Sequence, residues 1–278
     1  MTTLDYRATG DAPVLADPAS LPRRVSPVDA LTQTMVMAWR ATKKMRRNFE
    51  QFFDVTIQPL LFTAMFAGIF GGAVAGSVDD YLPLLIPGLI GQTVLTACVA
   101  TGTQLREDMD KGVFERFKVL PISRVAPLAG PMVADTIRYA IASVLTFATG
   151  IVMGYRPGGG AFGLTAAVLL AIFTGWSMAW IFTWFGTVGS SAQAVQGYSL
   201  MVMFPLTFLS NAFVPLDTLP PWLQAFATVN PVSHVVTALR DLANEGAVTA
   251  EVGWAVVACL AVVAVFAPLS VRSFTRKM

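Results

Sequence analysis

The chain contains few side chains that could carry out chemistry. Its 278 residues include one histidine, His234, and the motifs H-E-x-x-H and G-x-S-x-G do not occur, so no catalytic residues are expected. Cys98 and Cys259 lie inside apolar runs and are interpreted as small packing residues. No G-x-x-x-x-G-K-[ST] segment is present to cradle nucleotide phosphates. The sequence therefore predicts neither an enzyme nor a metal site, and no cofactor bound by this chain.

The composition indicates the environment in which the chain folds. Apolar residues make up 55% of it and charged residues 13%, with a mean hydropathy of +0.62. A soluble domain carries about a quarter charged residues, which it needs to cover its surface. The net charge of +2 is too small to indicate a nucleic-acid partner. The composition therefore predicts a membrane protein.

Charge-free runs long enough to cross about 30 Å of hydrocarbon predict six transmembrane helices. The runs cover residues 55–78, 81–105, 139–155, 157–216 and 252–271. The fourth run is long enough for two spans, with a turn near Gly189. The third is short, so its helix is expected to begin near Thr136, with Arg138 reaching toward the membrane surface and Asp135 hydrated at the helix end.

The distribution of basic residues predicts the topology. Seventeen of the 19 lysines and arginines fall before the first span, between the second and third spans, or after the last span. Only Arg156 and Arg240 fall on the opposite side. This bias predicts a multi-pass membrane protein with both termini in the cytoplasm. Residues 1–25, with three aspartates and three prolines, are predicted to be a disordered cytoplasmic tail before a membrane domain over residues 26–278.

One further uncharged segment, residues 218–239, is not predicted to span the membrane. Prolines and an asparagine interrupt it, and freed backbone groups are tolerated at membrane depth only where protein or water satisfies them. The segment is therefore predicted to form two re-entrant half-helices before the last span, in preference to a further transmembrane helix. The residues assigned to this feature are Pro220, Pro221, Trp222, Asn230 and Pro231.

The segment from Val28 to Phe53 has the pattern of an amphipathic helix. At 100° per residue its apolar side chains share one face, opposite a basic face. The apolar face comprises Val28, Leu31, Met35, Trp39, Phe49 and Phe53, and the basic face Arg40, Lys43, Lys44 and Arg47. This predicts a helix lying along the inner leaflet, which either anchors the chain to lipid or transmits movement from a cytoplasmic partner.

The connection between the second and third spans, residues 106–138, is long enough to hold structure. Met109, Val113 and Phe117 recur at helical spacing among charges of both signs. They predict a short amphipathic helix beneath the membrane, which is either a solvated face or a surface that docks into a groove on another protein.

Two motifs resemble those of a known family. The stretch R-E-D-M-D-K-G-V-F-E-R from Arg106, followed by L-P-I-S-R from Leu120, resembles the cytoplasmic loop of type-2 ATP-binding-cassette export permeases. The stretch L-P-P-W-L from Leu219, with Asn230-Pro231 and Ala238-Leu239-Arg240, resembles the segment before their last span. With the six-span plan, the likeness covers about residues 28–278 and is greatest for the daunorubicin-resistance subgroup.

The resemblance implies a mechanism and partners. Two permease copies would face each other, and each would rest on a separate ATPase subunit that binds ATP and magnesium. Residues 107–116 would form a coupling helix toward the ATPase, and residues 218–239 would close the outer end of the pathway. The coupling residues carried over are Arg106, Glu107, Asp110, Gly112, Phe114, Glu115 and Arg116.

The resemblance implies export of hydrophobic drugs or antibiotics out across a bacterial plasma membrane, with export of a complex lipid or a polysaccharide as the alternative. An ion-coupled carrier is less favoured, because the predicted spans contain no titratable group at depth. Aromatic and sulfur side chains suit a flat hydrophobic substrate, although such residues commonly face lipid or pack together. The candidate pathway residues are Phe62, Phe66, Met201, Phe204 and Phe208.

Small residues recur along the first span. Gly68, Gly72 and Gly76 are spaced by four, which predicts close approach of another helix, either from the same chain or from a second copy. Trp176, Trp180 and Trp184 have the same spacing and predict one packing ridge.

Overall fold

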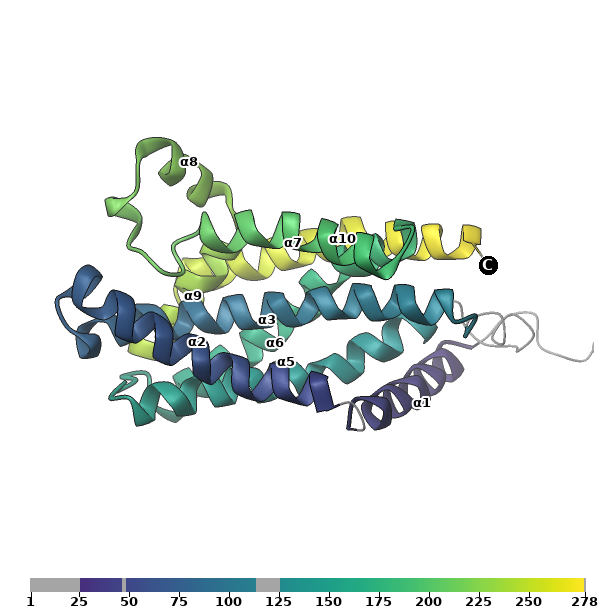
Figure 1. Cartoon of the computed structure of the whole chain (residues 1–278), viewed down its shortest axis with the longest axis horizontal. Helices are drawn as coiled ribbons and strands as arrows, with labels where there is room; N and C mark the ends of the chain where they lie inside the picture. The colour runs from purple at the N-terminus through teal and green to yellow at the C-terminus, as the bar shows by residue number, and fades with distance from the viewer. Residues whose placement is uncertain (1–25, 47–48, 114–125, 278) are drawn as a thin grey trace, which may run out of the picture.

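A computed structural model describes residues 26–46, 49–113 and 126–277, and its regular structure over these residues is entirely helical. Figure 1 shows long helices running roughly side by side along one axis. The elements are α1 (Pro27–Arg46), α2 (Phe49–Ala75), α3 (Val78–Asp110), α5 (Ala126–Val152), α6 (Gly160–Val188), α7 (Ala192–Phe208), η2 (Leu216–Thr218), α8 (Pro221–Val229), α9 (Pro231–Glu245) and α10 (Ala250–Lys277).

Four helices of the described residues are both long and apolar enough to cross a membrane. They lie in α2, α3, α6 and α10. The other two predicted spans correspond to α5, with 27 residues, and α7, with 17 residues. At 1.5 Å per residue, α7 extends about 25 Å, which is less than the hydrocarbon thickness. The chain is therefore a multi-pass membrane protein.

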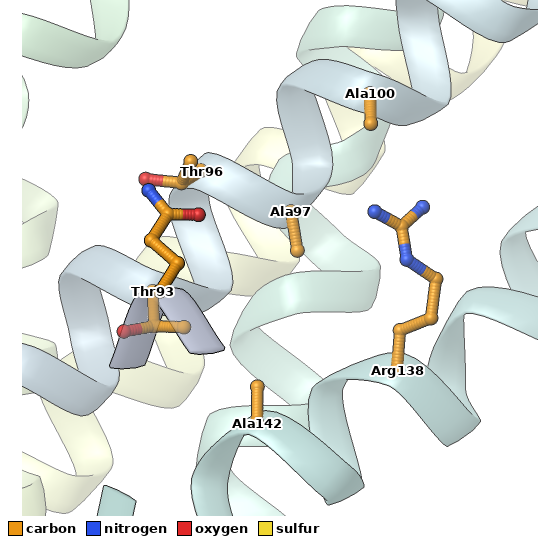
Figure 2. Close-up of a pocket in the computed structure, with 7 residues that line it drawn as sticks. Thr93, Thr96, Ala97, Ala100, Arg138 and Ala142 are labelled. Carbon is orange, nitrogen blue, oxygen red and sulfur yellow. The ribbon is translucent and has the colours of Figure 1, made fainter. Parts of the chain in front are cut away.

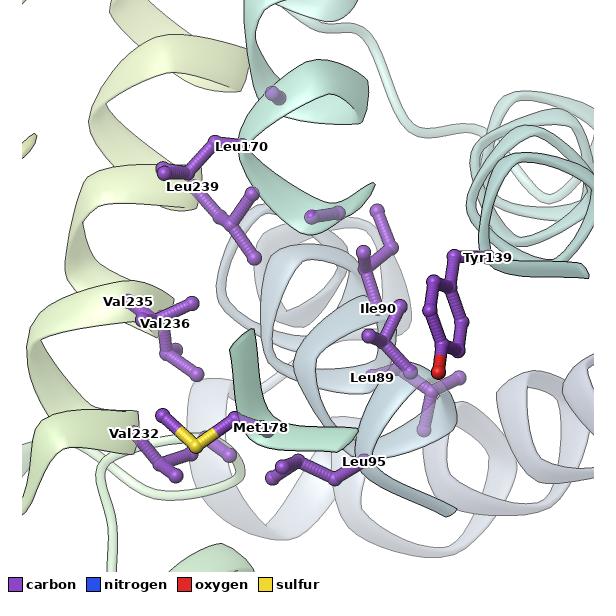
Figure 3. Close-up of a cluster of buried hydrophobic side chains, with 14 of the residues drawn as sticks. Leu89, Ile90, Leu95, Tyr139, Leu170, Met178, Val232, Val235, Val236 and Leu239 are labelled. Carbon is purple, nitrogen blue, oxygen red and sulfur yellow. The ribbon is translucent and has the colours of Figure 1, made fainter. Parts of the chain in front are cut away.

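Helix α3 is the central element of the bundle. It packs against α2, α5, α6, α7 and α9. Figure 3 shows Leu89 and Ile90 of α3 among apolar side chains from α6 and α9, with Tyr139 of α5 beside them. The hydrophobic face of α9 is thus buried in the core, although α9 is too short to be counted among the apolar spans.

The crossing of α3 and α6 is made possible by glycine. A Cβ added at Gly102 would lie 2.2 Å from the Phe182 carbonyl oxygen, and one added at Gly186 would lie 2.5 Å from the Gly102 carbonyl oxygen. No side chain fits between the two backbones at these positions.

The regularly spaced glycines of α2 do not pack in this way. A Cβ at Gly68 or Gly72 would meet no atom within 4 Å, so among the described residues no helix of this chain approaches them. Gly76 lies beyond the end of α2 with a φ of +81°, where it turns the chain into α3. The predicted close packing of these glycines is therefore not found among the described residues of this chain, and contact with a second copy stays a prediction.

The amphipathic segment forms two helices where the pattern predicted one. α1 ends at Arg46 and α2 begins at Phe49, so Phe49 and Phe53 belong to the following helix. α1 packs against α5, with Ala38 buried and the Met37 side chain against Gly130.

The apolar face of α1 points away from the bundle. Its side chains Val28, Leu31, Met35 and Trp39 are between 58% and 73% exposed, which leaves them free to contact lipid. Lys43, predicted on the opposite face, places its ammonium 5.6 Å from the Trp39 ring, because residues four apart on a helix are neighbours. The side chain of Lys44, and Arg47 as a whole, lie outside the described residues.

Two short helices precede the last long helix. α8 and α9 are separated at Asn230–Pro231, and proline begins each of them at its first position. The Asn230 side chain accepts a hydrogen bond from the Val232 amide at 2.9 Å and donates to the Leu206 carbonyl at 2.8 Å. α9 continues beyond the predicted end at Leu239 to Glu245, where Gly246, with a φ of +67°, caps it.

Candidate functional site

The bundle has two distinct ends. Figure 1 shows α1 and the C-terminal part of α10 at one end, and α8 at the other. We refer to these as the α1 end and the α8 end. The described residues of the predicted coupling segment lie at the α1 end, where α3 finishes.

The coupling residues that the structure describes are the last turn of α3 and its cap. Arg106 pairs with Asp110, and Lys111 pairs with Glu107 at 3.1 Å. Gly112 has a φ of +66°. Its amide bonds to the Met109 carbonyl, and the Val113 amide bonds to the Asp108 carbonyl, which is the Schellman arrangement that ends a helix.

This cap overturns one prediction. A single amphipathic helix through Met109, Val113 and Phe117 is wrong, because α3 ends at Asp110 and Val113 lies in the turn after it. The left-handed glycine between them breaks the helical spacing. The other predicted coupling residues, Phe114, Glu115 and Arg116, lie outside the described residues.

A buried ion pair lies between α3 and α5. Arg138 donates to one carboxylate oxygen of Asp135 at 3.0 Å, and Thr101 donates to the other at 2.6 Å. Arg138 is 3% exposed and Asp135 is 7% exposed. The prediction that Arg138 reaches the surface and Asp135 is hydrated is therefore wrong. Each side chain neutralises the other inside the bundle, and α5 continues through both from Ala126, about ten residues before the expected start at Thr136.

Arg138 also lines a small pocket between α2, α3 and α5, which Figure 2 shows. Its volume is about 40 Å³. This is enough for a few water molecules and far below the roughly 300–1,000 Å³ of drug-sized sites. The lining residues are Gln58, Thr93, Thr96, Ala97, Ala100, Arg138 and Ala142.

The polar groups of this pocket are only partly satisfied. The hydroxyls of Thr93 and Thr96 donate to carbonyls of their own helix at 2.7 Å and 3.0 Å, so their oxygens can still accept. The Arg138 Nε is buried and has no protein partner among the described residues. The pocket therefore offers a fixed cationic donor and hydroxyl acceptors.

Aromatic rings form a continuous row that runs from α2 to α7 through the segment that follows α7. Phe66 stacks on Phe62 with ring centroids 5.8 Å apart and on Phe213 at 4.7 Å. Phe213 stacks in turn on Phe208 at 5.4 Å, and Phe208 on Phe204 at 5.5 Å. We call these five residues the aromatic row.

Four predicted pathway residues thus lie together, and Phe213 joins them. Sequence reasoning missed Phe213, because it follows α7 in a segment without helical periodicity. Met201 lies apart from the row and is 77% exposed. Of the predicted tryptophan ridge, Trp176 and Trp180 contact each other edge to face, while Trp184 packs against Phe266 of α10.

At the α8 end, side chains of α9 satisfy the backbone of α3. Pro87 has no N–H, so the Pro83 carbonyl lacks its usual helical partner. Asn244 donates to that oxygen at 3.0 Å, and Arg240 donates to the neighbouring Leu84 carbonyl at 3.3 Å. Arg240 also donates to the Asn211 carbonyl at 3.1 Å, so it is a structural donor and not a free surface charge.

Two further contacts hold this end together. The Tyr155 hydroxyl donates to the Asn244 side chain, and burial raises the pKa of Tyr155 to about 12. His234 lies 2.7 Å from a Glu251 carboxylate oxygen through Nδ1 and 3.1 Å from the Thr228 carbonyl through Nε2, in agreement with a structural role. Of the predicted gate residues, Trp222 is 67% exposed.

Comparison with known proteins gives consistent matches. Residues 32–243 match the family model described as ABC-2 type transporter. The daunorubicin resistance ABC transporter permease protein DrrB1 of Streptomyces coeruleorubidus is 39% identical over 280 residues, covering 100% of this chain and 99% of the relative. The probable doxorubicin resistance ABC transporter permease protein DrrC of Mycobacterium tuberculosis is 24% identical, covering 78% and 79% of the two chains. The inner membrane transport permease YadH of Escherichia coli is 22% identical, covering 74% and 84%.

Proposed function

Because this chain belongs to the ABC-2 type transporter family, we propose that it is the permease subunit of an ATP-driven exporter of hydrophobic drugs or antibiotics. The observation that carries the proposal is the full-length similarity to a daunorubicin resistance permease. The family's permeases are membrane subunits, and the sequence contains no phosphate-cradling motif. ATP and magnesium would therefore bind to a separate ATPase subunit.

The topology proposed is six spans with both termini in the cytoplasm of a bacterial cell. α2, α3, α5, α6, α7 and α10 would be the spans. The strong bias of basic residues supports this orientation, which makes the α1 end cytoplasmic and the α8 end external. α8 and α9 would then be re-entrant helices closing the outer end of the pathway.

Coupling would occur at the α1 end. The end of α3 and the segment after Gly112 would contact the ATPase, and α1 would lie along the inner leaflet beside it. Two permease copies are proposed to face each other, with the open glycine face of α2 as part of the contact. Movement of the substrate would follow alternating closure of a cavity between the copies.

The aromatic row would form one wall of that cavity. Phe208 and Phe204 are 44% and 49% exposed, so part of the row is open to a flat apolar molecule. An ion-coupled carrier is less favoured, because the acid within α5, Asp135, is already bound to Arg138 and Thr101. Export of a complex lipid or a polysaccharide by the same fold is the alternative.

The test is reconstitution of the permease and its ATPase in liposomes. Doxorubicin should move in an ATP-dependent way, with no movement when either subunit is omitted. Glu115→Lys should uncouple ATP hydrolysis from transport, whereas the same reversal at the exposed Glu245, beyond the other end of the bundle, should not. Movement of a labelled lipid without doxorubicin would favour the alternative, and transport by the permease alone would reject the proposal.

A further inference from the structure

The pocket between α2, α3 and α5 has the properties of a binding subsite. Arg138 is almost fully buried and lines the pocket, and its Nε has no partner within residues 26–46, 49–113 and 126–277. Figure 2 shows its side chain extending from α5 toward Ala97 and Ala100 of α3. A buried donor with no partner is costly in a membrane protein, so such a group commonly marks a ligand or water position.

The charges of the site indicate what kind of group it binds. Asp135 already neutralises Arg138 through a contact of 3.0 Å. A second anion would enter beside the Asp135 carboxylate and be repelled by it, and a cation would meet the Arg138 guanidinium. A neutral hydrogen-bond acceptor would complete the Arg138 donor with no change in charge.

The size of the pocket further limits which chemical groups can bind in it. A volume of about 40 Å³ admits a carbonyl or hydroxyl oxygen and its nearest atoms but is too small for a body of several fused rings. Any larger part of the ligand must therefore lie outside the pocket.

The aromatic row lies next to the pocket along α2. Gln58 of the pocket lining and Phe62 and Phe66 of the row are spaced by four residues, so they share one face of the helix. A ligand that places an oxygen in the pocket would therefore have its body against Phe62, at the end of the row that is only partly buried.

We propose that this pocket is a subsite for a neutral carbonyl or hydroxyl oxygen of a planar amphiphile, bound by Arg138 and Gln58 while the aromatic row holds the planar body. The inference rests on the proposed function and adds a substrate class to it: flat molecules with an uncharged oxygen at one edge. Arg138 is then a specificity-determining residue and not only half of an ion pair.

A matched pair of probes tests the subsite. 9,10-Anthraquinone and anthracene have the same three-ring plane, and only the first has carbonyl oxygens. Binding of each tritiated compound is measured by scintillation proximity on the full chain in lipid nanodiscs. Anthraquinone should bind at least about tenfold more tightly, the size of one hydrogen bond to a charged group.

Two pocket variants test whether the tighter binding of anthraquinone depends on the pocket. Ala100→Leu fills the pocket and should abolish the preference for anthraquinone. Ala148→Leu, the same change at an exposed position of α5 away from the pocket, should leave that preference unchanged. The double variant Asp135→Asn with Arg138→Met removes the donor but keeps the site neutral, so it should also lose the preference. Equal affinities in the unaltered protein, or a preference that survives both pocket variants, would overturn the proposal.

Transport is measured separately, so the two proposals can fail independently. ATP-driven doxorubicin movement without an anthraquinone preference would reject the subsite and keep drug export. A preference that depends on the pocket, without doxorubicin movement, would keep the subsite and reject drug export.

Discussion

The strongest prediction concerns the stability contributed by the Asp135–Arg138 pair. Arg138→Met would leave the Asp135 carboxylate inside the bundle with only Thr101 as a partner. Breaking a buried pair in this way costs about 3–5 kcal/mol, because one charge stays buried and uncompensated. Asp135→Asn should cost a similar amount, since it leaves the Arg138 guanidinium buried without its counter-charge.

The double variant should be more stable than either single variant. With Asn and Met in place, no net charge remains in the bundle, and replacing a whole buried pair is often close to neutral. We expect the double variant to recover at least about 2 kcal/mol relative to the worse single variant. The double variant should therefore lose much less unfolding free energy than the sum of the losses of the two single variants.

The assay is unfolding of the detergent-solubilised chain by increasing SDS, followed by tryptophan fluorescence. Arg156→Met is the control: it removes an exposed arginine that donates to the Ile151 and Tyr155 carbonyls, and it should change the free energy of unfolding by less than about 1 kcal/mol. If the losses of the two single variants simply add in the double variant, the side chains do not act as a pair, and the reasoning is refuted.

Three further predictions concern other parts of the fold. Gly72→Leu should leave unfolding of the chain nearly unchanged but lower the yield of cross-linked permease pairs in detergent, since no described residue of this chain covers Gly72; an unchanged yield would exclude that face from the contact. Asn244→Leu should cost about 1–3 kcal/mol in the SDS titration, because the Pro83 carbonyl loses its donor, and a loss below about 0.5 kcal/mol would show that water replaces it. Tyr155 has a pKa of about 12 in the folded chain against 10.0 as its ordinary value, so stability should fall as the pH rises from 10 to 12; Tyr155→Phe should flatten that fall, and an unchanged slope would contradict it.

The sequence predicted the elements better than their contacts. Long charge-free runs located the helices, and Asn230–Pro231 located the break between α8 and α9, because both signals are local. The same charge-free criterion placed the start of α5 too late. It treated Asp135 and Arg138 as a boundary, although their spacing of three on a helix was the available signal for a pair.

Other features depend on tertiary packing and had no local signal. Gly68 and Gly72 have the spacing of a contact face but meet no other helix in the part of the chain that the structure describes, whereas the close crossing occurs at Gly102 and Gly186, which are not regularly spaced. Phe213 completes the aromatic row from an irregular segment. In each case the partner comes from a distant part of the sequence.

The hydrogen bonds from Asn244 and Arg240 to α3 limit how the helices at the α8 end can move. They join α9 to α3 at the point where the prolines of α3 interrupt its own hydrogen bonds. We therefore expect α9 and α3 to move together. α8 is held differently, since its principal contacts are with α9 and η2 alone. We therefore expect any opening at this end to change the backbone at Asn230, with α8 and η2 moving relative to α9.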